Sequence, residues 1–306
     1  MLAVVSPGQG AQTPGMLAPW LAVDSFAESI ARSSEVSGID LAQVGTHADA
    51  DTIRDTAIAQ PLLVATALAS ARALGAGTAF TASLTAGHSV GELAAAALAG
   101  VISDAEAMRL VTIRGKAMAA AAAASEPTSM AAILGGDSDE VSEVLASLGL
   151  TAANVNGGGQ VVAAGAQRDI DSLVANPPTR ARVIVLQVAG AFHTSYMAPA
   201  VDALRDAAAT TAVAEPTAIL LSNADGAAVT SGADALDRIV RQVANPVRWD
   251  LCMESMAARG VTGIIELAPG GVLAGLAKRA LKDVPCVALK TPDDLAAARD
   301  LAGASS

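Results

Sequence analysis

Aromatic residues, cysteine and positive charge are all scarce in this sequence. Three Phe, two Trp and one Tyr make up 2% of its 306 residues, so the core must be aliphatic and few rings remain on which nucleobases could stack. The 19 basic residues are outnumbered by 30 acidic ones, and a net charge of −11 argues against binding to nucleic acid or to a membrane surface. The two cysteines, Cys252 and Cys286, have no CxxC spacing, which predicts neither a disulfide framework nor a metal site.

The sequence also lacks a clean hydrophobic segment of membrane-spanning length. Its most apolar stretch, residues 83–102, carries His88, Ser89 and Glu92 in its middle, and the first residues lack the basic segment of a signal peptide. With 52% apolar and 16% charged residues, the chain is expected to fold. We therefore expect a soluble, cytoplasmic monomer with neither nucleic acid nor a membrane as its partner.

Strand patterns alternate with helical patterns at both ends of the chain. This alternation is typical of an α/β layer built on a mostly parallel sheet. The predicted strands are Leu2–Val5, Thr81–Thr85, Thr217–Leu221 and Gly263–Leu267. The predicted helices lie near residues 16–22, at Leu62–Leu74, and in a segment that ends at Ala280.

Residues 126–190 follow a different pattern, which begins after the alanine run Ala119–Ala124. Strands are predicted at Ser129–Leu134, Leu150–Val155, Val161–Ala164 and Arg182–Val188, and helices at Asp137–Leu148 and Ile170–Ala175. The order βαββαβ is that of a ferredoxin-like unit. We therefore expect a small subdomain at 126–190, inserted into a core formed by residues 1–125 and 191–306.

The segment Gly87-His88-Ser89-Val90-Gly91 fits the pattern G-x-S-x-G. In that pattern a serine lies on a sharp turn between a strand and a helix, and small flanking residues leave its hydroxyl exposed. An apolar strand pattern precedes the motif and an alanine-rich helical pattern follows it. Ser89 is therefore a candidate nucleophile; the alternative is a tight turn that only packs a helix on a sheet.

A serine nucleophile needs a base, and the sequence contains three histidines. His47 lies in an acidic loop and is expected at the surface. His88 adjoins the serine, and neighbouring side chains on such a turn point in different directions. His193 follows a β-branched strand, at the end where α/β sites collect, and is the candidate base unless it is an ordinary loop residue.

Arg114 lies in the apolar stripe of a predicted helix. The capping box Ser103–Glu106 starts that helix, and Arg114 falls seven residues after Ala107 and four before Met118. A guanidinium that faces the interior is costly unless it is paired. Its partner is either an internal carboxylate or the carboxylate of a substrate, and the spacing favours neither.

A glycine-rich turn, Pro7–Gln12, follows the first strand. It lacks the Lys-Ser/Thr of a P-loop and does not fit G-x-G-x-x-G. Gln9 on this turn could instead present hydrogen-bond donors to an oxyanion.

Taken together, these segments resemble the malonyl-CoA:acyl carrier protein transacylases of fatty acid and polyketide synthesis, most closely the discrete enzymes of actinomycetes. The resemblance extends over nearly the whole chain. The matching segments are Pro7–Gln12, Gln60-Pro61, Gly87–Glu92, Arg114-Gly115, Asn154–Asn156 with Gln160, Ala191–His193, Asn245–Val247 with Trp249, and Glu266 with Pro269-Gly270. One departure is Ser6, where many members carry Phe.

The resemblance implies an α/β-hydrolase-like core and a role for each matching residue. Ser89 would be the nucleophile, His193 its base, and the backbone carbonyl of Gln242 the third member of the triad. The backbone amides of Gln9 and Val90 would form the oxyanion hole. The substrate-binding residues would be Arg114 for the malonyl carboxylate, Phe192 as the malonyl-type signature, Asn156 and Gln160.

The implied activity is transfer of malonyl from malonyl-CoA, through an ester on Ser89, to the phosphopantetheine thiol of acyl carrier protein. Coenzyme A thioester is then a substrate, and no bound cofactor is expected. Because the carrier is acidic, we expect it to dock on a local basic patch; the candidates are Lys278, Arg279 and Lys282, with Lys116 as a further one.

Two other functions remain open at this point. An esterase or thioesterase could use the same serine turn with water as the acceptor, although Arg114 favours a carboxylated acyl group. A non-catalytic protein that binds nucleotides or docks a carrier could use the glycine-rich loops at 8–15 and 156–159.

Overall fold

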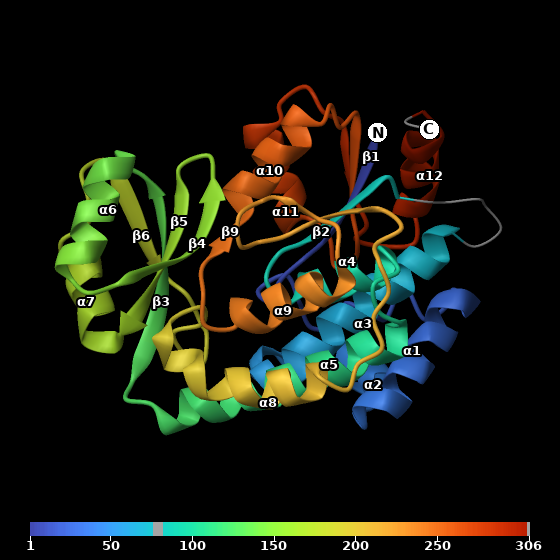
Figure 1. Ribbon diagram of the computed structural model, residues 1–306, viewed down its shortest axis with the longest axis horizontal. Coiled ribbons are helices and arrows are strands. Elements are labelled where there is room, and N and C mark those ends of the chain that lie inside the picture. Colours follow the sequence, from blue (N-terminus) through green and yellow to red (C-terminus); the bar gives the residue numbers. More distant parts are fainter. Residues whose placement is uncertain (76–81, 305–306) are drawn as a thin grey trace.

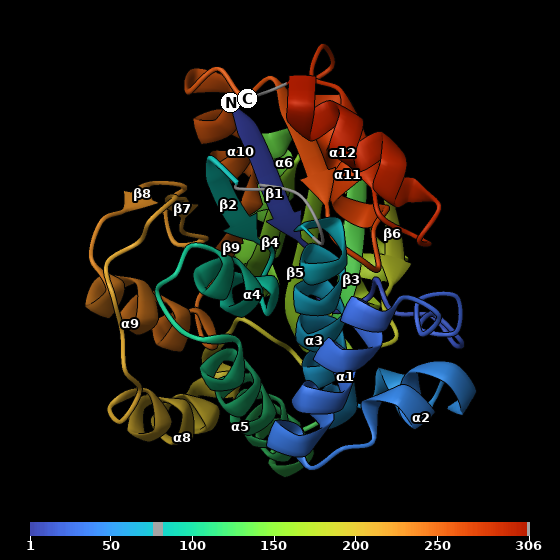
Figure 2. The same cartoon turned by 90° about the vertical axis from the view of Figure 1, so that its right-hand side faces the viewer.

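The computed structural model describes residues 1–75 and 82–304 of the chain. Two sheets organise the fold, and Figure 1 shows the smaller one, with its two helices, to the left of the larger. Both ends of the described chain lie close together at one end of the larger unit, as the two views in Figures 1 and 2 agree. The protein is therefore of the mixed α/β class, as the alternating pattern predicted.

The larger sheet has six strands in the order β11-β10-β1-β2-β7-β8. The strands are β1 (Leu2–Ser6), β2 (Leu84–Gly87), β7 (Ile219–Leu221), β8 (Ala228–Val229), β10 (Gly263–Glu266) and β11 (Cys286–Ala288). All neighbours are parallel except β7 and β8. Since the chain leaves β1 toward β2 on one side and reaches β10 on the other, the carboxyl ends of β1 and β2 form the crevice where α/β sheets place their sites.

Ten of the helices that the structure describes surround this sheet. They are α1 (Asp24–Ser37), α2 (Leu41–His47), α3 (Thr56–Gly75), α4 (Gly91–Leu98), α5 (Asp104–Ala124), α8 (Ala198–Ala208), α9 (Gly232–Gln242), α10 (Trp249–Ala258), α11 (Val272–Ala280) and α12 (Asp294–Ala304). Short 3-10 turns occupy Thr52–Arg54 and Ser195–Met197. Figure 2 shows α1, α3 and α5 side by side, and these helices contact one another.

The strand period of two divides the aliphatic side chains between the two faces of the larger sheet. On β1, Leu2 and Val4 face the core that contains α3 and α5, whereas Ala3 and Val5 face the core that contains α10 and α11. A strand buried on both faces is a continuous apolar run, which is why Leu2–Val5 could be recognised from sequence.

The smaller sheet has the order β6-β3-β5-β4-β9. Its elements are β3 (Thr128–Gly135), α6 (Ser138–Ser147), β4 (Thr151–Gly157), β5 (Gln160–Ala166), α7 (Gln167–Ala175), β6 (Ala181–Val185) and, from much later in the chain, β9 (Val247–Arg248). The predicted order βαββαβ is present in residues 128–185. The strand β9 pairs in parallel with β4, so a segment outside 126–190 completes this sheet.

Some predictions for local structure were wrong or incomplete. Residues 16–22 form successive turns rather than a helix, because Pro19 has no N–H to donate and the amides of Ala18 and Trp20 bond three residues back. Of the strand expected at Thr81–Thr85, Thr81 lies outside the described residues and β2 begins at Leu84. Helices α1, α2, α8, α9, α10 and α12 were not predicted.

One described helix, α3, is long and apolar enough to cross a membrane by length and composition. Most of it (83% of the apolar window) is buried inside the fold, against α1, α4 and α5. It is a core helix, and it carries Gln60 toward the site.

Candidate active site

Ser89 lies at the sharp turn between β2 and α4, where its backbone has a φ of +52°. This left-handed conformation is costly for a residue with a Cβ, and such strain collects at functional sites. The flanking glycines are required by space. A Cβ at Gly87 would overlap the backbone of Gly91, and one at Gly91 would overlap the carbonyl of Ser6.

His193 faces this serine from the loop after β6. Its Nε2 lies 2.7 Å from the Oγ of Ser89, and its Nδ1 lies 2.8 Å from the backbone carbonyl of Gln242. Since a carbonyl can only accept, Nδ1 carries the proton and Nε2 is free to accept one. His193 also has a positive φ, +61°, so both partners are held in uncommon backbone conformations.

The electrostatics of the site keep His193 neutral. Burial, together with the nearby charge of Arg114, lowers the pKa of His193 to about 3. At neutral pH the ring is therefore neutral, and its Nε2 can act as a base. Of the other two histidines, His47 is exposed on α2, and His88 points away from Ser89 with its Nε2 2.9 Å from the Oδ1 of Asn156.

The backbone amides of Gln9 and Val90 lie beside the serine turn, at the ends of β1 and β2. Among the residues that the structure describes, neither amide donates a hydrogen bond. Val90 is the N-cap of α4, so the positive end of that helix adds to the field there. Gly8 allows the first loop to approach, because a Cβ at this position would lie 2.7 Å from the carbonyl oxygen of His88.

Arg114 is 1% exposed, and α5 aims its guanidinium at the serine. Nη1 donates to the Oε1 of Gln60 (2.7 Å), and Nη2 donates to the Oε1 of Gln242 (2.9 Å) and approaches the Oγ of Ser89 (3.4 Å). Nε is buried without a partner. In the described part of the chain no carboxylate lies within ion-pair distance of Arg114, so of the two partners the sequence left open, the internal carboxylate is absent.

Three residues that support the site were not proposed as site residues from sequence. Asn223 accepts the backbone N–H of Ser89 (2.8 Å), and Glu92 accepts the N–H of Asn223 (2.6 Å). Burial raises the pKa of Glu92 to about 8. Gln60 holds Arg114 as described. A lone carboxylate in the apolar run after the serine could have indicated Glu92, whereas nothing near Asn223 in the sequence indicates its role.

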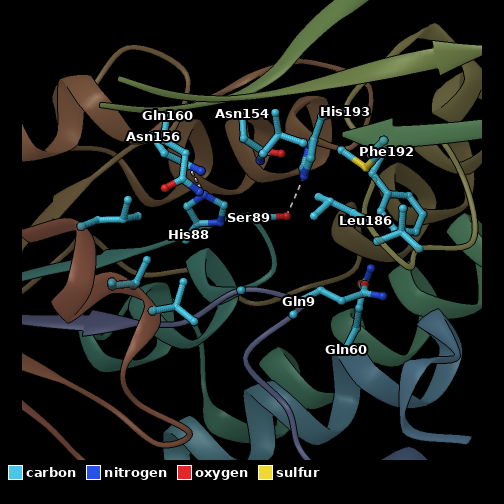
Figure 3. Close-up of a pocket in the computed structure, with 18 of the residues that line it drawn as sticks. Gln9, Gln60, His88, Ser89, Asn154, Asn156, Gln160, Leu186, Phe192 and His193 are labelled. Carbon is cyan, nitrogen blue, oxygen red and sulfur yellow. Dashed lines mark hydrogen bonds between the residues drawn. The ribbon is translucent and has the colours of Figure 1, made fainter. Parts of the chain in front are cut away.

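The site opens into a cavity of about 210 Å³. Figure 3 shows His88, Asn156 and Gln160 on one side of Ser89, and Leu186 and Phe192 on the other. Gln9 and Gln60 lie below Leu186 in this view. The lining also includes Asn154 and the apolar residues Met118, Met130, Val162 and Val188.

The predicted basic patch lies on α11 and on the turn that follows it, close to Gln160 in the cavity lining. Lys278, Arg279 and Lys282 are exposed, and Arg279 donates to the Oε1 of Gln160 (2.9 Å), a lining residue. The same helix contributes Val272, Leu273 and Leu276 to the lining. Lys116 is exposed too, but on α5, which lies apart from α11 in both views (Figures 1 and 2).

Glu266 fixes the start of α11. Its buried carboxylate accepts the backbone amides of Gly271 (2.7 Å), Leu273 (2.9 Å) and Ala274 (2.8 Å). Residues 1–75 and 82–304 contain no cluster of three or more metal-ligating side chains.

Comparison with known proteins adds a family to this geometry. A family model described as an acyl transferase domain matches residues 4–299. The malonyl CoA-acyl carrier protein transacylase of Mycobacterium tuberculosis is 50% identical over 297 residues, which cover 96% of this chain and 98% of that protein. The protein of the same name from Escherichia coli is 36% identical over 307 residues, covering 98% and 99% of the two chains.

Solved structures give the same result. The crystal structure of MCAT from Mycobacterium tuberculosis aligns with a TM-score of 0.91 at 50% identity, over 96% of this chain and 98% of that one. A type II PKS acyl-carrier protein in complex with its malonyl-transacylase, PlMCAT:AntF, contains a chain that aligns with a TM-score of 0.91 at 32% identity, over 98% of this chain and 99% of that one.

Proposed function

The chain belongs to the acyl transferase domain family, and we propose that it moves malonyl from malonyl-CoA, through an ester on Ser89, to the phosphopantetheine thiol of acyl carrier protein. It thereby supplies extender units for fatty acid or polyketide synthesis. The observation that carries this proposal is the buried guanidinium of Arg114, 3.4 Å from the serine oxygen and without a direct ion pair to any carboxylate of the described residues.

Binding places the acyl group before the chemistry starts. The free carboxylate of malonyl-CoA pairs with Arg114, since a guanidinium matches a carboxylate in a two-point fork. This contact sets the thioester carbonyl against the Oγ of Ser89 and turns an intermolecular attack into a positioned one.

In the acylation step, the Oγ of Ser89 attacks the thioester carbonyl while its proton passes to the Nε2 of His193, 2.7 Å away. The proton on Nδ1 stays on that nitrogen and is donated to the backbone carbonyl of Gln242, a hydrogen bond that holds the ring and stabilises the imidazolium. The tetrahedral oxyanion is held by the amides of Gln9 and Val90, and donors of this kind contribute about 3 kcal/mol each.

Collapse of the intermediate breaks the carbon–sulfur bond, and coenzyme A leaves with the proton from His193. The malonyl ester on Ser89 remains. In the second half-reaction the thiol of the carrier gives its proton to His193 and its sulfur attacks the ester. The products are the malonyl thioester of the carrier and free Ser89, so no redox or metal chemistry enters the balance.

The two sides of the cavity bind different parts of the substrate. Phe192 lines the acyl side, where its bulk limits substituents on the malonyl α-carbon, and the guanidinium of Arg114 reaches the site at the Oγ of Ser89. The amides of Asn156 and Gln160 lie on the other side and take the thiol-bearing arm of coenzyme A or of the carrier. Arg279, bonded to Gln160, connects this arm site to the surface.

The carrier docks on the patch formed by Lys278 and Arg279 on α11 and Lys282 on the turn after it, beside the entrance to the arm site. A local positive patch attracts an acidic partner even though the whole enzyme is acidic. Lys116 on α5 is a separate candidate contact. The similarity to PlMCAT, whose structure includes an acyl-carrier protein, supports a carrier of this class as the partner.

The finer architecture is part of the same proposal. Residues 1–125 and 191–306 form an α/β-hydrolase-like catalytic core, and residues 126–190 form a ferredoxin-like subdomain whose strand order β6-β3-β5-β4 supports that description. We place the enzyme in the cytoplasm as a monomer that needs no bound cofactor and contacts neither nucleic acid nor membranes.

A direct test of the nucleophile is the intact mass of the protein after brief exposure to malonyl-CoA. The wild type is expected to gain one malonyl group, which maps to the peptide that contains Ser89, and Ser89→Ala is expected to gain none. A malonyl group on Ser89→Ala, or no adduct on a folded wild type, would contradict the proposal.

A further inference from the structure

Gln242 contacts the site with two different groups. Its backbone carbonyl accepts the Nδ1–H of His193 (2.8 Å), and its side-chain oxygen accepts the Nη2–H of Arg114 (2.9 Å). We propose that the side chain of Gln242 is a positioning residue for Arg114 and so determines the preference for carboxylated acyl groups, independently of the carbonyl that orients His193. This inference depends on the proposed function, because it assigns the role of Arg114 to acyl recognition.

The orientation of the Gln242 amide is fixed by its neighbours. Arg114 can only donate, so the oxygen of the amide must face it. The Nε2 group then faces acceptors, namely a carboxylate oxygen of Glu92, the backbone carbonyl of Ser89 (3.1 Å) and the Oδ1 of Asn223 (3.1 Å). Gln242 is 5% exposed, so water cannot replace these contacts freely.

The partners of Arg114 are neutral amides, and this matters for its function. Gln60 on α3 and Gln242 on α9 each accept one N–H from a different arm of the guanidinium. Amide oxygens fix the plane of the group without cancelling its charge, whereas a carboxylate would compete with the substrate. Burial lowers the pKa of Arg114 to about 10, which leaves it charged at neutral pH.

Glu92 anchors the amide without touching the arginine. One of its oxygens accepts from Gln242, and the other accepts the backbone N–H of Asn223 (2.6 Å), whose side chain in turn accepts the N–H of Ser89 (2.8 Å). The amide of Gln242 therefore separates the buried carboxylate of Glu92 from Arg114 and ties the arginine to the serine turn. A displacement of this amide would move the acyl anchor relative to the nucleophile.

The two roles of Gln242 can be separated by substitution, because every residue keeps its backbone carbonyl. Gln242→Met preserves length and volume and removes only the amide. Transfer of malonyl should then fall about 10- to 100-fold in kcat/KM, the range expected for hydrogen bonds to a charged group. Acylation of Ser89 by acetyl-CoA, which has no carboxylate for Arg114 to bind, should fall less, so that the malonyl-to-acetyl ratio of kcat/KM drops about tenfold or more.

A double-mutant cycle with Arg114→Ala tests whether the effect acts through the arginine. In the Arg114→Ala background, Gln242→Met should change malonyl transfer less than about twofold. The matched control is Gln167→Met, the same substitution at a half-buried position on α7 outside the cavity lining, which should leave both acyl donors unaffected. Equal losses for malonyl and acetyl in Gln242→Met, or an undiminished loss in the Arg114→Ala background, would overturn the inference.

A second variant keeps the inference testable if Gln242→Met does not fold. Gln242→Glu retains the shape and still accepts from Arg114, but it supplies a negative charge that competes with the malonyl carboxylate. Malonyl transfer should fall more than acetyl acylation does, and parallel losses of both would again refute the role. The proposed function itself fails separately, when the wild type forms no malonyl ester on Ser89.

Discussion

At the scale of single residues, Arg114 is the most informative side chain in the molecule. It lies in the apolar stripe of α5, and it is held by Gln60 and Gln242 rather than by a carboxylate. Among the described residues the charge of Glu92 acts on Arg114 but no carboxylate forms a direct ion pair with it, and a buried cation without a direct partner is unfavourable until an anion enters. The positive charge in the site therefore favours the binding of an acyl group that carries a carboxylate.

Removing the guanidinium of Arg114 should change which acyl donors the enzyme prefers. We expect Arg114→Ala to lower kcat/KM for malonyl-CoA by about 100-fold or more, because a two-point charge-assisted pair contributes about 3 kcal/mol. Acetyl-CoA should lose little. The control is Arg109→Ala, one turn earlier on α5, where the side chain bonds Glu106 and Thr211 away from the cavity. An unchanged ratio of malonyl to acetyl transfer in Arg114→Ala would refute the role.

Glu92 predicts a pH dependence of stability. Burial raises the pKa of this carboxyl from 4.5 to about 8, so the folded state binds its proton more tightly than the unfolded state does. Ionisation then penalises the fold increasingly as pH rises above 4.5, and the penalty is complete above about 8. It amounts to a few kcal/mol.

The measurement is the free energy of unfolding of the wild type minus that of Glu92→Gln, from denaturant titrations at several pH values. This difference should become less favourable to the wild type between pH 5 and pH 8, since the amide does not titrate. A difference that is constant over this range would show that Glu92 does not titrate as argued.

Ser89, His193 and Arg114 could be proposed from sequence because each has a local signal: a small-residue turn, a position after a strand, and a charge in an apolar stripe. Asn223 and Gln60 have no such signal. Their roles depend on contacts with residues 134 and 54 positions away, to Ser89 and Arg114, which no local pattern encodes. Site residues can thus be predicted where the sequence around them carries a signal. Residues that only hold them in place, through contacts with distant segments, cannot.

At the scale of elements, the serine turn depends on close backbone packing. Gly91→Ala should destabilise the protein by several kcal/mol and abolish acylation, because its Cβ would overlap the carbonyl of Ser6 at the end of β1. Gly275→Ala is the matched control, since this helical glycine on α11 has open space around it and alanine favours a helix. The melting temperature of Gly91→Ala should fall, and that of Gly275→Ala should hold or rise. Equal melting temperatures for the two would contradict this account of the turn.

Helix α11 carries the expected docking surface. Reversal of charge in Lys278→Glu/Arg279→Glu should raise the apparent KM for acyl carrier protein about tenfold or more at low salt and leave acylation by malonyl-CoA nearly unchanged. The control with the same change in net charge is Arg32→Glu/Arg205→Glu, at exposed positions on α1 and α8. If both double variants raise KM equally, docking follows net charge and not this patch.

Most elements of the smaller sheet were predictable because their strands and helices have clear periods and glycine-rich connections. The segment 16–22 was not, since its apolar spacing resembles a helix while Pro19 prevents one. Strand β9 has two residues and can be recognised as a strand only because it pairs with β4. Elements shorter than one period carry no pattern to read.

At the scale of the whole molecule, the net charge of −11 and the low aromatic content exclude partners rather than identify one. The mixed α/β class followed from alternation of strands and helices along the chain. The family resemblance implied that Gln9, Ser89, Arg114 and His193 meet, but no local pattern shows how; the strand order brings together the ends of β1 and β2, which Gln9 and Ser89 follow. The site is therefore assembled by the topology of the fold, and no single motif contains it.

The central claim is that the malonyl ester on Ser89 waits for a thiol and is not lost to water. The most direct test is to load the enzyme with labelled malonyl-CoA, remove excess donor, and follow the label with and without phosphopantetheinylated carrier protein. The account predicts an ester that persists without the carrier and moves to its thiol within seconds of mixing. Release of the label as free malonate at the same rate in both samples would identify a hydrolase and contradict the account.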